Sequence, residues 1–372
     1  MAATAIVPEG LLRWPWKVSL VLLALTGFGA AVLHSAAGGS WEPYAAKHLM
    51  RFGVFLVMAL VMSRFNDTVY RFMAYPAYVV LVFLLVVVEA IGFTGGGSQR
   101  WIDLGFMQLQ PSELMKPAIV IVLARFFATL PPGMVGTLRG IAPVAILLGV
   151  PCSLVLMQPD LGTTLAIVAS GAVIVFMAGA PLKWFLVTGG VALAALPFAY
   201  QFALSPYQQR RVTTFLDPAS DPLGKGYQIT QSKIAIGSGG LTGKGFGEGS
   251  QSHLAYLPEA HTDFIFATMA EEWGVMGGVF VLMCYALILR WALRVASRAP
   301  HRFGRLMAVG MGFTIFFYAA VNMLMVMGFA PVVGIPLPFM SHGGSSMMTV
   351  MICIGSLMAV DHWGKTQSRR RY

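Results

Sequence analysis

The sequence predicts an all-α integral membrane protein of about ten transmembrane helices, with one long extracytoplasmic loop between the seventh and eighth helices. Three observations predict this class: the composition, the spacing of the apolar runs, and the placement of Lys and Arg. Of the 372 residues, 57% are hydrophobic and 11% are charged. Soluble domains carry about 25% charged residues, and the mean hydropathy of +0.73 agrees with a chain that lies in lipid.

The apolar runs account for the predicted helices one by one. A helix needs roughly 20 residues to cross about 30 Å of hydrocarbon. The fifth and sixth runs are separated only by Gln158, Pro159 and Asp160, where the proline and its polar neighbours favour a tight turn over one long helix. In chain order the predicted spans are 15–34, 48–63, 74–93, 115–130, 141–157, 161–178, 184–203, 263–290, 306–329 and 343–361.

Lys and Arg alternate between connecting segments, and this pattern predicts the orientation. If the N-terminus is cytoplasmic, the short outer segments hold only Lys47, Arg51, Arg100 and Lys116, and the inner segments hold far more. Both termini are therefore predicted to be cytoplasmic. The net charge of +10 largely follows from this asymmetry and does not indicate nucleic-acid binding. The basic C-terminal tail is read as a solvated flank or as a contact for anionic membrane lipids.

The chain is predicted to form a single polytopic membrane domain over 1–372, with a large extracytoplasmic loop over 204–262. Within this loop, "YQITQSKIAIGS" can be read as an amphipathic helix or as a short strand. The stretch "GGLTGKGFGEG" does not match a phosphate-binding loop, because Lys244 is followed by Gly245 and not by Ser or Thr. We interpret its glycines as flexible turns that let the backbone approach a ligand.

Charged side chains near membrane depth are all predicted to lie at the outer face. Glu113 and Lys116 are three residues apart, so they share a helix face and can pair. Thr262 is a candidate N-cap for the eighth helix, and Glu272 is expected to cap a neighbouring helix or to pair with an interior base. The predicted outer-face set is Arg51, Glu113, Lys116, Asp160, Arg210, Arg211 and Asp263.

Such a mixture of acids and bases suits a substrate that carries both phosphate and sugar. Arg binds phosphate oxygens in pairs, and Lys offers a point charge. A carboxylate can act as a general base for a hydroxyl group, or can hold a divalent cation against a pyrophosphate. A proton relay for transport would use the same residue types, so spacing alone leaves an enzyme and a transporter open.

Several long motifs, in order, resemble the SEDS family (shape, elongation, division and sporulation). They are "GGSQRWIDLGFMQLQPSELMKP", "QPDLGTT", the stretch from "PYQQRRVTTFLDP" to "LPEAHTDFIFATMAEEWG", and "PVVGIPLPFMSHGGSS". Together they extend over nearly the whole chain. The compact length, "FLDPASDPLGKGYQ" and "GKGFGEGSQS" are more similar to the elongation type, RodA, than to the division paralogue, FtsW.

The resemblance implies a peptidoglycan glycosyltransferase that polymerises lipid II during elongation and shape maintenance, with release of undecaprenyl pyrophosphate. It implies a class B penicillin-binding protein as the cross-linking partner. The family's essential loop aspartate matches Asp263, which we expect to be the general base. The family's "QPSE" glutamate and following lysine match Glu113 and Lys116, and its "QPD" aspartate matches Asp160.

The leaving pyrophosphate needs positive charge, and two sources stay open. One is the substrate-binding set of Arg51, Lys116, Arg210 and Arg211. The other is a divalent cation, Mg²⁺ or Mn²⁺, held by Asp160, Glu113 or Asp263. Two alternative functions are a lipid II flippase and a structural scaffold. A flippase should need polar lining through the whole bilayer depth, whereas the inner halves of most predicted spans are nearly uncharged.

Overall fold

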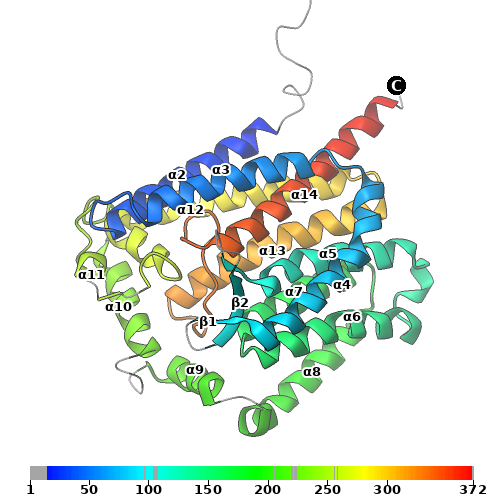
Figure 1. The fold of residues 1–372 in the computed structure, drawn as a ribbon, viewed down its shortest axis with the longest axis horizontal. Helices are drawn as coiled ribbons and strands as arrows, with labels where there is room; N and C mark the ends of the chain where they lie inside the picture. The colour runs from blue at the N-terminus through cyan, green and yellow to red at the C-terminus, as the bar shows by residue number, and fades with distance from the viewer. Residues whose placement is uncertain are drawn as a thin grey trace, which may run out of the picture.

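The computed structural model describes residues 15–95, 98–103, 108–203, 206–218, 221, 224–254, 256–257 and 259–370. Within these ranges the chain is a bundle of long helices with one small sheet (Figure 1). The helices that match the ten predicted spans are α2 (Trp16–Ala36), α3 (Tyr44–Met62), α4 (Asp67–Ile91), α5 (Pro111–Thr129), α6 (Leu138–Met157), α7 (Leu161–Met177), α8 (Leu182–Phe198), α12 (Ile265–Arg298), α13 (Arg302–Val326) and α14 (Gly344–Arg370).

Each predicted run therefore coincides with one helix, and the fold class is confirmed as helical and multi-pass. In the described part of the chain, seven of these helices are long and apolar enough to cross a membrane. The other three are α5, which opens with charged residues, and α7 and α8, which have 17 residues each. The number of spans stays a prediction. The predicted turn at Pro159 is confirmed, because α6 ends at Met157 and α7 begins at Leu161.

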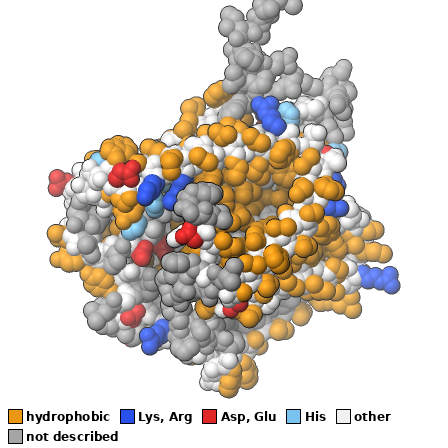
Figure 2. All heavy atoms as spheres, viewed as in Figure 1, with side chains coloured by type: hydrophobic (Ala, Val, Ile, Leu, Met, Phe, Trp, Pro, Cys, Tyr) orange, Lys and Arg blue, Asp and Glu red, His pale blue; other side chains and the backbone are white. Residues whose placement is uncertain are grey.

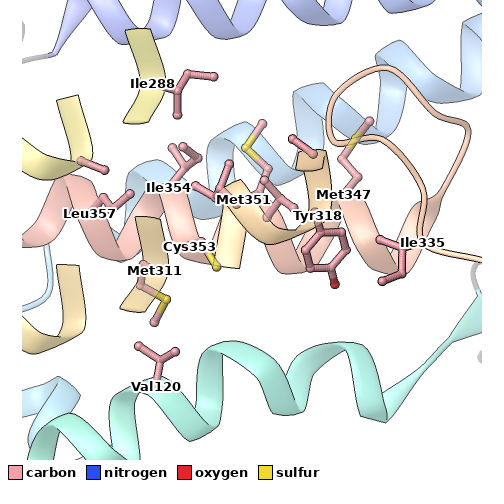
Figure 3. Packing of buried hydrophobic residues seen from close by; sticks show 14 of the residues in the cluster. Val120, Ile288, Met311, Tyr318, Ile335, Met347, Met351, Cys353, Ile354 and Leu357 are labelled. Carbon is pink, nitrogen blue, oxygen red and sulfur yellow. The ribbon is translucent and has the colours of Figure 1, made fainter. Parts of the chain in front are cut away.

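Helix α13 lies at the centre of the bundle and packs against α5, α7, α12 and α14 (Figure 1). Figure 3 shows this core, where Met311 and Tyr318 of α13 lie between Val120 of α5 and the Met351 and Ile354 side chains of α14. All five side chains are buried. Lipid tails are as apolar as these residues, so close van der Waals packing is what stabilises the association of the helices.

The two ends of the bundle differ. The start of α2 and the end of α14 lie at one end, and α10 and α11 lie at the other, which we call the loop end (Figure 1). On the same face, Figure 2 shows hydrophobic side chains over the middle and charged side chains mostly toward the left and right edges. The region predicted as a long loop, 204–262, contains three helices in its described part: α9 (Pro206–Leu216), α10 (Lys225–Ser238) and α11 (Ser250–His253). The stretch "YQITQSKIAIGS" is thus helical.

A small antiparallel sheet connects α4 to α5. Its strands are β1 (Phe93–Gly95), β2 (Ser98–Asp103) and β3 (Gln108–Leu109), in the order β1-β2-β3. Ile102 pairs with Leu109 between β2 and β3. Strand β2 packs against α4 and α5.

Helix α12 is broken at Gly274, where φ is 60° and ψ is −154°. At the break, two backbone carbonyls and two backbone N–H groups of α12 form hydrogen bonds with segment 240–245. The bonds are Lys244 N–H to Glu271 O (3.0 Å), Gly245 N–H to Glu272 O (3.1 Å), Val275 N–H to Gly240 O (3.0 Å) and Met276 N–H to Leu241 O (3.1 Å).

Glycine is required for this contact, because a Cβ added at Gly243 would lie 2.0 Å from the carbonyl oxygen of Glu272. In the described part of the loop, Gly239 and Gly243 thus bring the backbone against α12. The approach of this segment to a ligand stays a prediction.

Both acids of α12 are buried. The fully buried carboxylate of Glu271 accepts hydrogen bonds from Lys244 Nζ (2.6 Å), Ser250 Oγ (3.0 Å) and the Gln251 N–H (3.2 Å). Glu271 therefore pairs with a base of the loop, a role that the sequence did not indicate for it. Glu272 accepts a hydrogen bond from the Ser35 hydroxyl of α2.

The prediction that Thr262 caps α12 is wrong. The helix begins at Ile265, with Phe264 at the N-cap position. The Thr262 hydroxyl donates instead to the carboxylate of Glu259, at 2.6 Å. The Thr262 hydroxyl is therefore bonded to Glu259, three residues upstream, and not to the first turn of α12.

Candidate active site

A cavity of about 610 Å³ lies at the loop end, where the first turns of several helices meet the sheet and two loops. Most of its side chains are polar or charged. Its lining residues are Arg51, Arg100, Trp101, Asp103, Gln108, Gln110, Glu113, Asp160, Thr163, Thr262, Asp263, Gly334, Pro336, His342, Gly343, Gly344, Ser345 and Ser346.

Four of the seven predicted site residues line this cavity: Arg51, Glu113, Asp160 and Asp263. They come from α3, α5, the α6–α7 turn and the segment before α12, so the bundle brings together residues far apart in sequence. The other three lie elsewhere. Lys116 is fully buried beneath the cavity, and Arg210 and Arg211 belong to α9, which packs against α10.

Glu113 and Lys116 form a buried ion pair, as the sequence predicted. The Nζ–Oε1 distance is 2.5 Å, and the side chains of Lys116 and Glu113 are 0% and 8% exposed. Tyr318 of α13 completes the group, since its hydroxyl accepts from Lys116 Nζ (2.7 Å) and donates to Oε2 of Glu113. Figure 3 shows the Tyr318 hydroxyl directed toward α5. Both carboxylate oxygens of Glu113 therefore have donors.

Asp160 caps the N-terminus of α7. Its Oδ1 accepts from the Thr163 N–H at 3.1 Å, and its Oδ2 accepts from the Thr163 hydroxyl at 3.0 Å and from Gln110 Nε2 at 3.1 Å. A carboxylate at this position is also favoured by the helix dipole. Arg100 of β2 lies 3.7 Å from the same oxygen and donates to the carbonyls of Gln158 (2.9 Å) and Pro159 (2.8 Å).

The backbone around Asp263 is held by α13 and by the segment before α14. Asn322 Nδ2 donates to the carbonyl of Asp263 at 2.8 Å, and the Ser341 hydroxyl donates to the carbonyl of Thr262 at 2.6 Å. Gly334 faces the carboxylate, with φ of +75° and room for a Cβ only 3.4 Å from Asp263 Oδ2. These contacts hold the backbone from which the Asp263 side chain reaches the cavity wall.

His342 links Arg51 to the start of α3. Its Nε2 lies 3.2 Å from Arg51 NH1, and its Nδ1 lies 3.2 Å from the carbonyl oxygen of Tyr44. Burial, followed by the charge of Arg51, lowers the pKa of His342 to about 4. Burial also lowers the pKa of His261, whose ring stacks on Tyr44 at 4.1 Å, although the nearby Glu259 opposes this shift.

Arg100, Gln110 and His342 are site residues that the sequence set did not include. Arg100 was counted only as an outer basic residue, and Gln110 carries no charge to attract attention. His342 stands in the quoted motif "FMSHGGSS". The motif was the only sequence signal for it, because its partners come from other parts of the chain.

The predicted cation ligands Asp160 and Glu113 already have protein partners. The Asp160 oxygens accept from Thr163 and Gln110, and the Glu113 oxygens face Lys116 and Tyr318. Among the described residues, no group of three or more His, Cys, Asp or Glu side chains is arranged to hold a metal ion. A divalent cation held by Asp160, Glu113 or Asp263 stays a prediction.

The family model for FtsW, RodA and SpoVE, described as a cell cycle protein, matches residues 16–366. This chain belongs to that family. All cavity residues lie within the match, which confirms the SEDS resemblance. The peptidoglycan glycosyltransferase MrdB of Escherichia coli is 44% identical over 94% of both chains. The stage V sporulation protein E of Bacillus subtilis is 34% identical over 94% of this chain and 96% of its own length.

Solved structures of related proteins share the fold. A chain of a peptidoglycan synthase complex that coordinates polymerization and crosslinking superposes with a TM-score of 0.81 and 31% identity, covering 94% of this chain and 98% of that one. The rod shape determining protein RodA of Thermus thermophilus superposes with a TM-score of 0.71 and 28% identity, covering 94% and 97%. This chain therefore has the helical membrane architecture of the SEDS fold.

Proposed function

We propose that this chain is a peptidoglycan glycosyltransferase of the RodA type, which polymerises lipid II into glycan strands during cell elongation. The observation that carries the proposal is a cavity that both Asp263 and Arg51 line, in a member of a family that includes a named peptidoglycan glycosyltransferase. An acid and a fixed cation in one cavity suit a sugar hydroxyl and a pyrophosphate.

Asp263 acts as the general base in this proposal. The 4-hydroxyl of the N-acetylglucosamine of lipid II gives its proton to the Asp263 carboxylate while its oxygen attacks the anomeric carbon of the donor chain. The bond from that carbon to the undecaprenyl pyrophosphate breaks, and the pyrophosphate leaves with the electron pair. One displacement inverts the anomeric centre, so a second, nucleophilic carboxylate is not needed.

Arg51 binds the leaving pyrophosphate in this proposal. Arg100 also lines the cavity, but it already donates to two backbone carbonyls and lies beside Asp160. Arg51 has the planar donor array that matches phosphate oxygens. Its side-chain partner among the described residues, His342, is an uncharged ring that does not neutralise the positive charge. Lys116, Arg210 and Arg211 lie outside the cavity lining and are not assigned to the pyrophosphate.

The enzyme is proposed to work in the bacterial inner membrane with both termini cytoplasmic and the cavity extracytoplasmic. The excess of Lys and Arg in the predicted inner segments supports this orientation. The start of α2 and the end of α14 lie at the end of the bundle opposite α10 and α11, which agrees with this orientation (Figure 1). The partner in this proposal is a class B penicillin-binding protein that cross-links the strands.

The test is glycan synthesis by the purified full-length protein with lipid II, with and without a class B penicillin-binding protein. We would compare wild type, Asp263→Asn, and Asp67→Asn as a matched control at the start of α4, where Asp67 pairs with Arg71 at 3.4 Å. Loss of a general base should lower the rate by about 100-fold or more, while the control should polymerise like wild type.

Two outcomes would contradict the proposal at different points. Equal polymer from Asp263→Asn and wild type would remove Asp263 from the chemical step. No polymer from wild type, even with the partner and Mg²⁺ present, would reject the glycosyltransferase, and a lipid II translocation assay in vesicles would then test the flippase. Repeating the wild-type assay with a chelator tests the predicted cation.

A further inference from the structure

His342 makes two hydrogen bonds that require opposite roles of its two ring nitrogens. Nε2 faces Arg51, which can only donate, and Nδ1 faces the carbonyl of Tyr44, which can only accept. Only the neutral ring with its proton on Nδ1 satisfies both partners. An imidazolium would present an N–H to the guanidinium and would place two positive charges side by side.

The surroundings of the ring favour this neutral form. The titratable and charged groups facing it are Arg51 and His48 of α3 and His261 of the segment before α12, and each of them disfavours a positive charge on His342. Tyr44 lies edge-on to the ring at 5.2 Å between centroids and supplies the opposing carbonyl. The ring therefore stays an acceptor for Arg51 at neutral pH.

The same residue also touches the segment that carries the proposed base. The His342 N–H donates to the carbonyl of His261 at 2.9 Å, two residues before Asp263. The His342 side chain thus holds the Arg51 guanidinium, and the His342 backbone holds the segment that precedes Asp263. Both contacts come from one residue just before α14. Packing alone would not need this combination of directed contacts.

We propose that His342 is a positioning residue that, as an uncharged acceptor, holds the Arg51 guanidinium in the direction from which it binds the pyrophosphate of the lipid-linked sugar. The inference rests on the proposed function for the identity of the substrate. It assigns to His342 no contact with the reacting atoms. A guanidinium has five N–H donors, and the bond to His342 uses one of them while orienting the remainder.

The first experiment separates binding from chemistry in the full-length protein. His342→Ala should raise the KM for lipid II by about tenfold, the value of one charge-assisted hydrogen bond, and should leave kcat within about threefold. His342→Gln should restore KM, because its amide can accept from Arg51 and donate to Tyr44. His34→Ala, a histidine of α2 outside the cavity lining, is the matched control. Equal KM values for His342→Ala and wild type would overturn the proposal, as would an equal loss of activity in the Ala and Gln variants.

A double-mutant cycle tests whether His342 acts through Arg51. In an Arg51→Gln background, His342→Ala should raise KM by less than about twofold, because the group that it positions is already gone. Full additivity of the two substitutions would overturn the proposal even if both variants fold, which thermal unfolding would establish.

Inorganic pyrophosphate binding distinguishes failure of this inference from failure of the proposed function. If wild type and His342→Gln bind pyrophosphate and His342→Ala and Arg51→Gln do not, the positioning role stands even where no glycan is made. If all four proteins bind it equally while wild type makes glycan, the proposed function stands and the positioning role is rejected.

Discussion

The buried group of Glu113, Lys116 and Tyr318 gives a sharp prediction about stability. Glu113→Gln keeps the shape of the side chain but leaves the Lys116 ammonium, which is fully buried, without its counter-charge. Breaking a buried pair by removing one partner costs about 3–5 kcal/mol. The Tyr318 hydroxyl at 2.7 Å and the Gln carbonyl still accept from the amine, so we expect the lower end of that range, about 3 kcal/mol.

The free energy of unfolding would be measured in mixed micelles by titration with a denaturing detergent. Lys116→Met alone should also lower the free energy of unfolding, because it leaves the buried Glu113 carboxylate without its counter-charge, with only the Tyr318 hydroxyl as a donor. The double variant Glu113→Gln, Lys116→Met removes both charges and should lie within about 1.5 kcal/mol of wild type, since buried pairs contribute little net stability. Single variants that each cost under about 1 kcal/mol, the value of exposed pairs, with an additive double variant, would refute the reasoning.

Two further predictions concern His342 and Gly334. Because the folded-state pKa of His342 lies at about 4 and the unfolded value at about 6.5, the unfolded chain binds the extra proton between these values. The free energy of unfolding should therefore fall as the pH drops from about 6.5 toward 4, and His342→Gln should lose less stability over this window; an unchanged slope would contradict the shift. Gly334→Ala should lower glycan synthesis about tenfold or more, since it strains a positive φ of +75° and puts a methyl group beside the Asp263 carboxylate. Equal rates for Gly334→Ala and wild type would show that the Asp263 carboxylate tolerates this contact.

Much of the fold was readable from the sequence because lipid leaves few choices for an apolar segment. Each of the ten runs became a helix, and Pro159 marked the turn between α6 and α7. The small sheet after α4 was not predicted, since its strands are only two to six residues long and lie between helices. The helical content of 204–262 was also underestimated, because its Gly-rich composition resembles that of a loop.

Charge near the start of a helix was the sequence signal for the residues that the structure brings together. Arg51, Glu113, Asp160 and Asp263 all line one cavity. Sequence position could not reveal depth, so Lys116 was grouped with them although α13 buries it. Sequence position also could not show which way a helix runs relative to the cavity. Arg210 and Arg211 lie in α9, outside the cavity lining. His342 and Arg100 were missed because their roles depend on contacts with residues 291 and 58 positions away.

The break in α12 has a mechanical consequence. Segment 240–245 supplies four backbone hydrogen bonds to the residues on either side of the break. The buried Glu271 carboxylate also accepts hydrogen bonds from Lys244, Ser250 and Gln251. Only the first two turns of α12, Ile265 to Glu271, separate these bonds from Phe264, the residue after Asp263. A displacement of segment 240–245 must therefore either break these hydrogen bonds or move the start of α12. The position of the loop and the position of the Asp263 backbone are coupled through this part of α12.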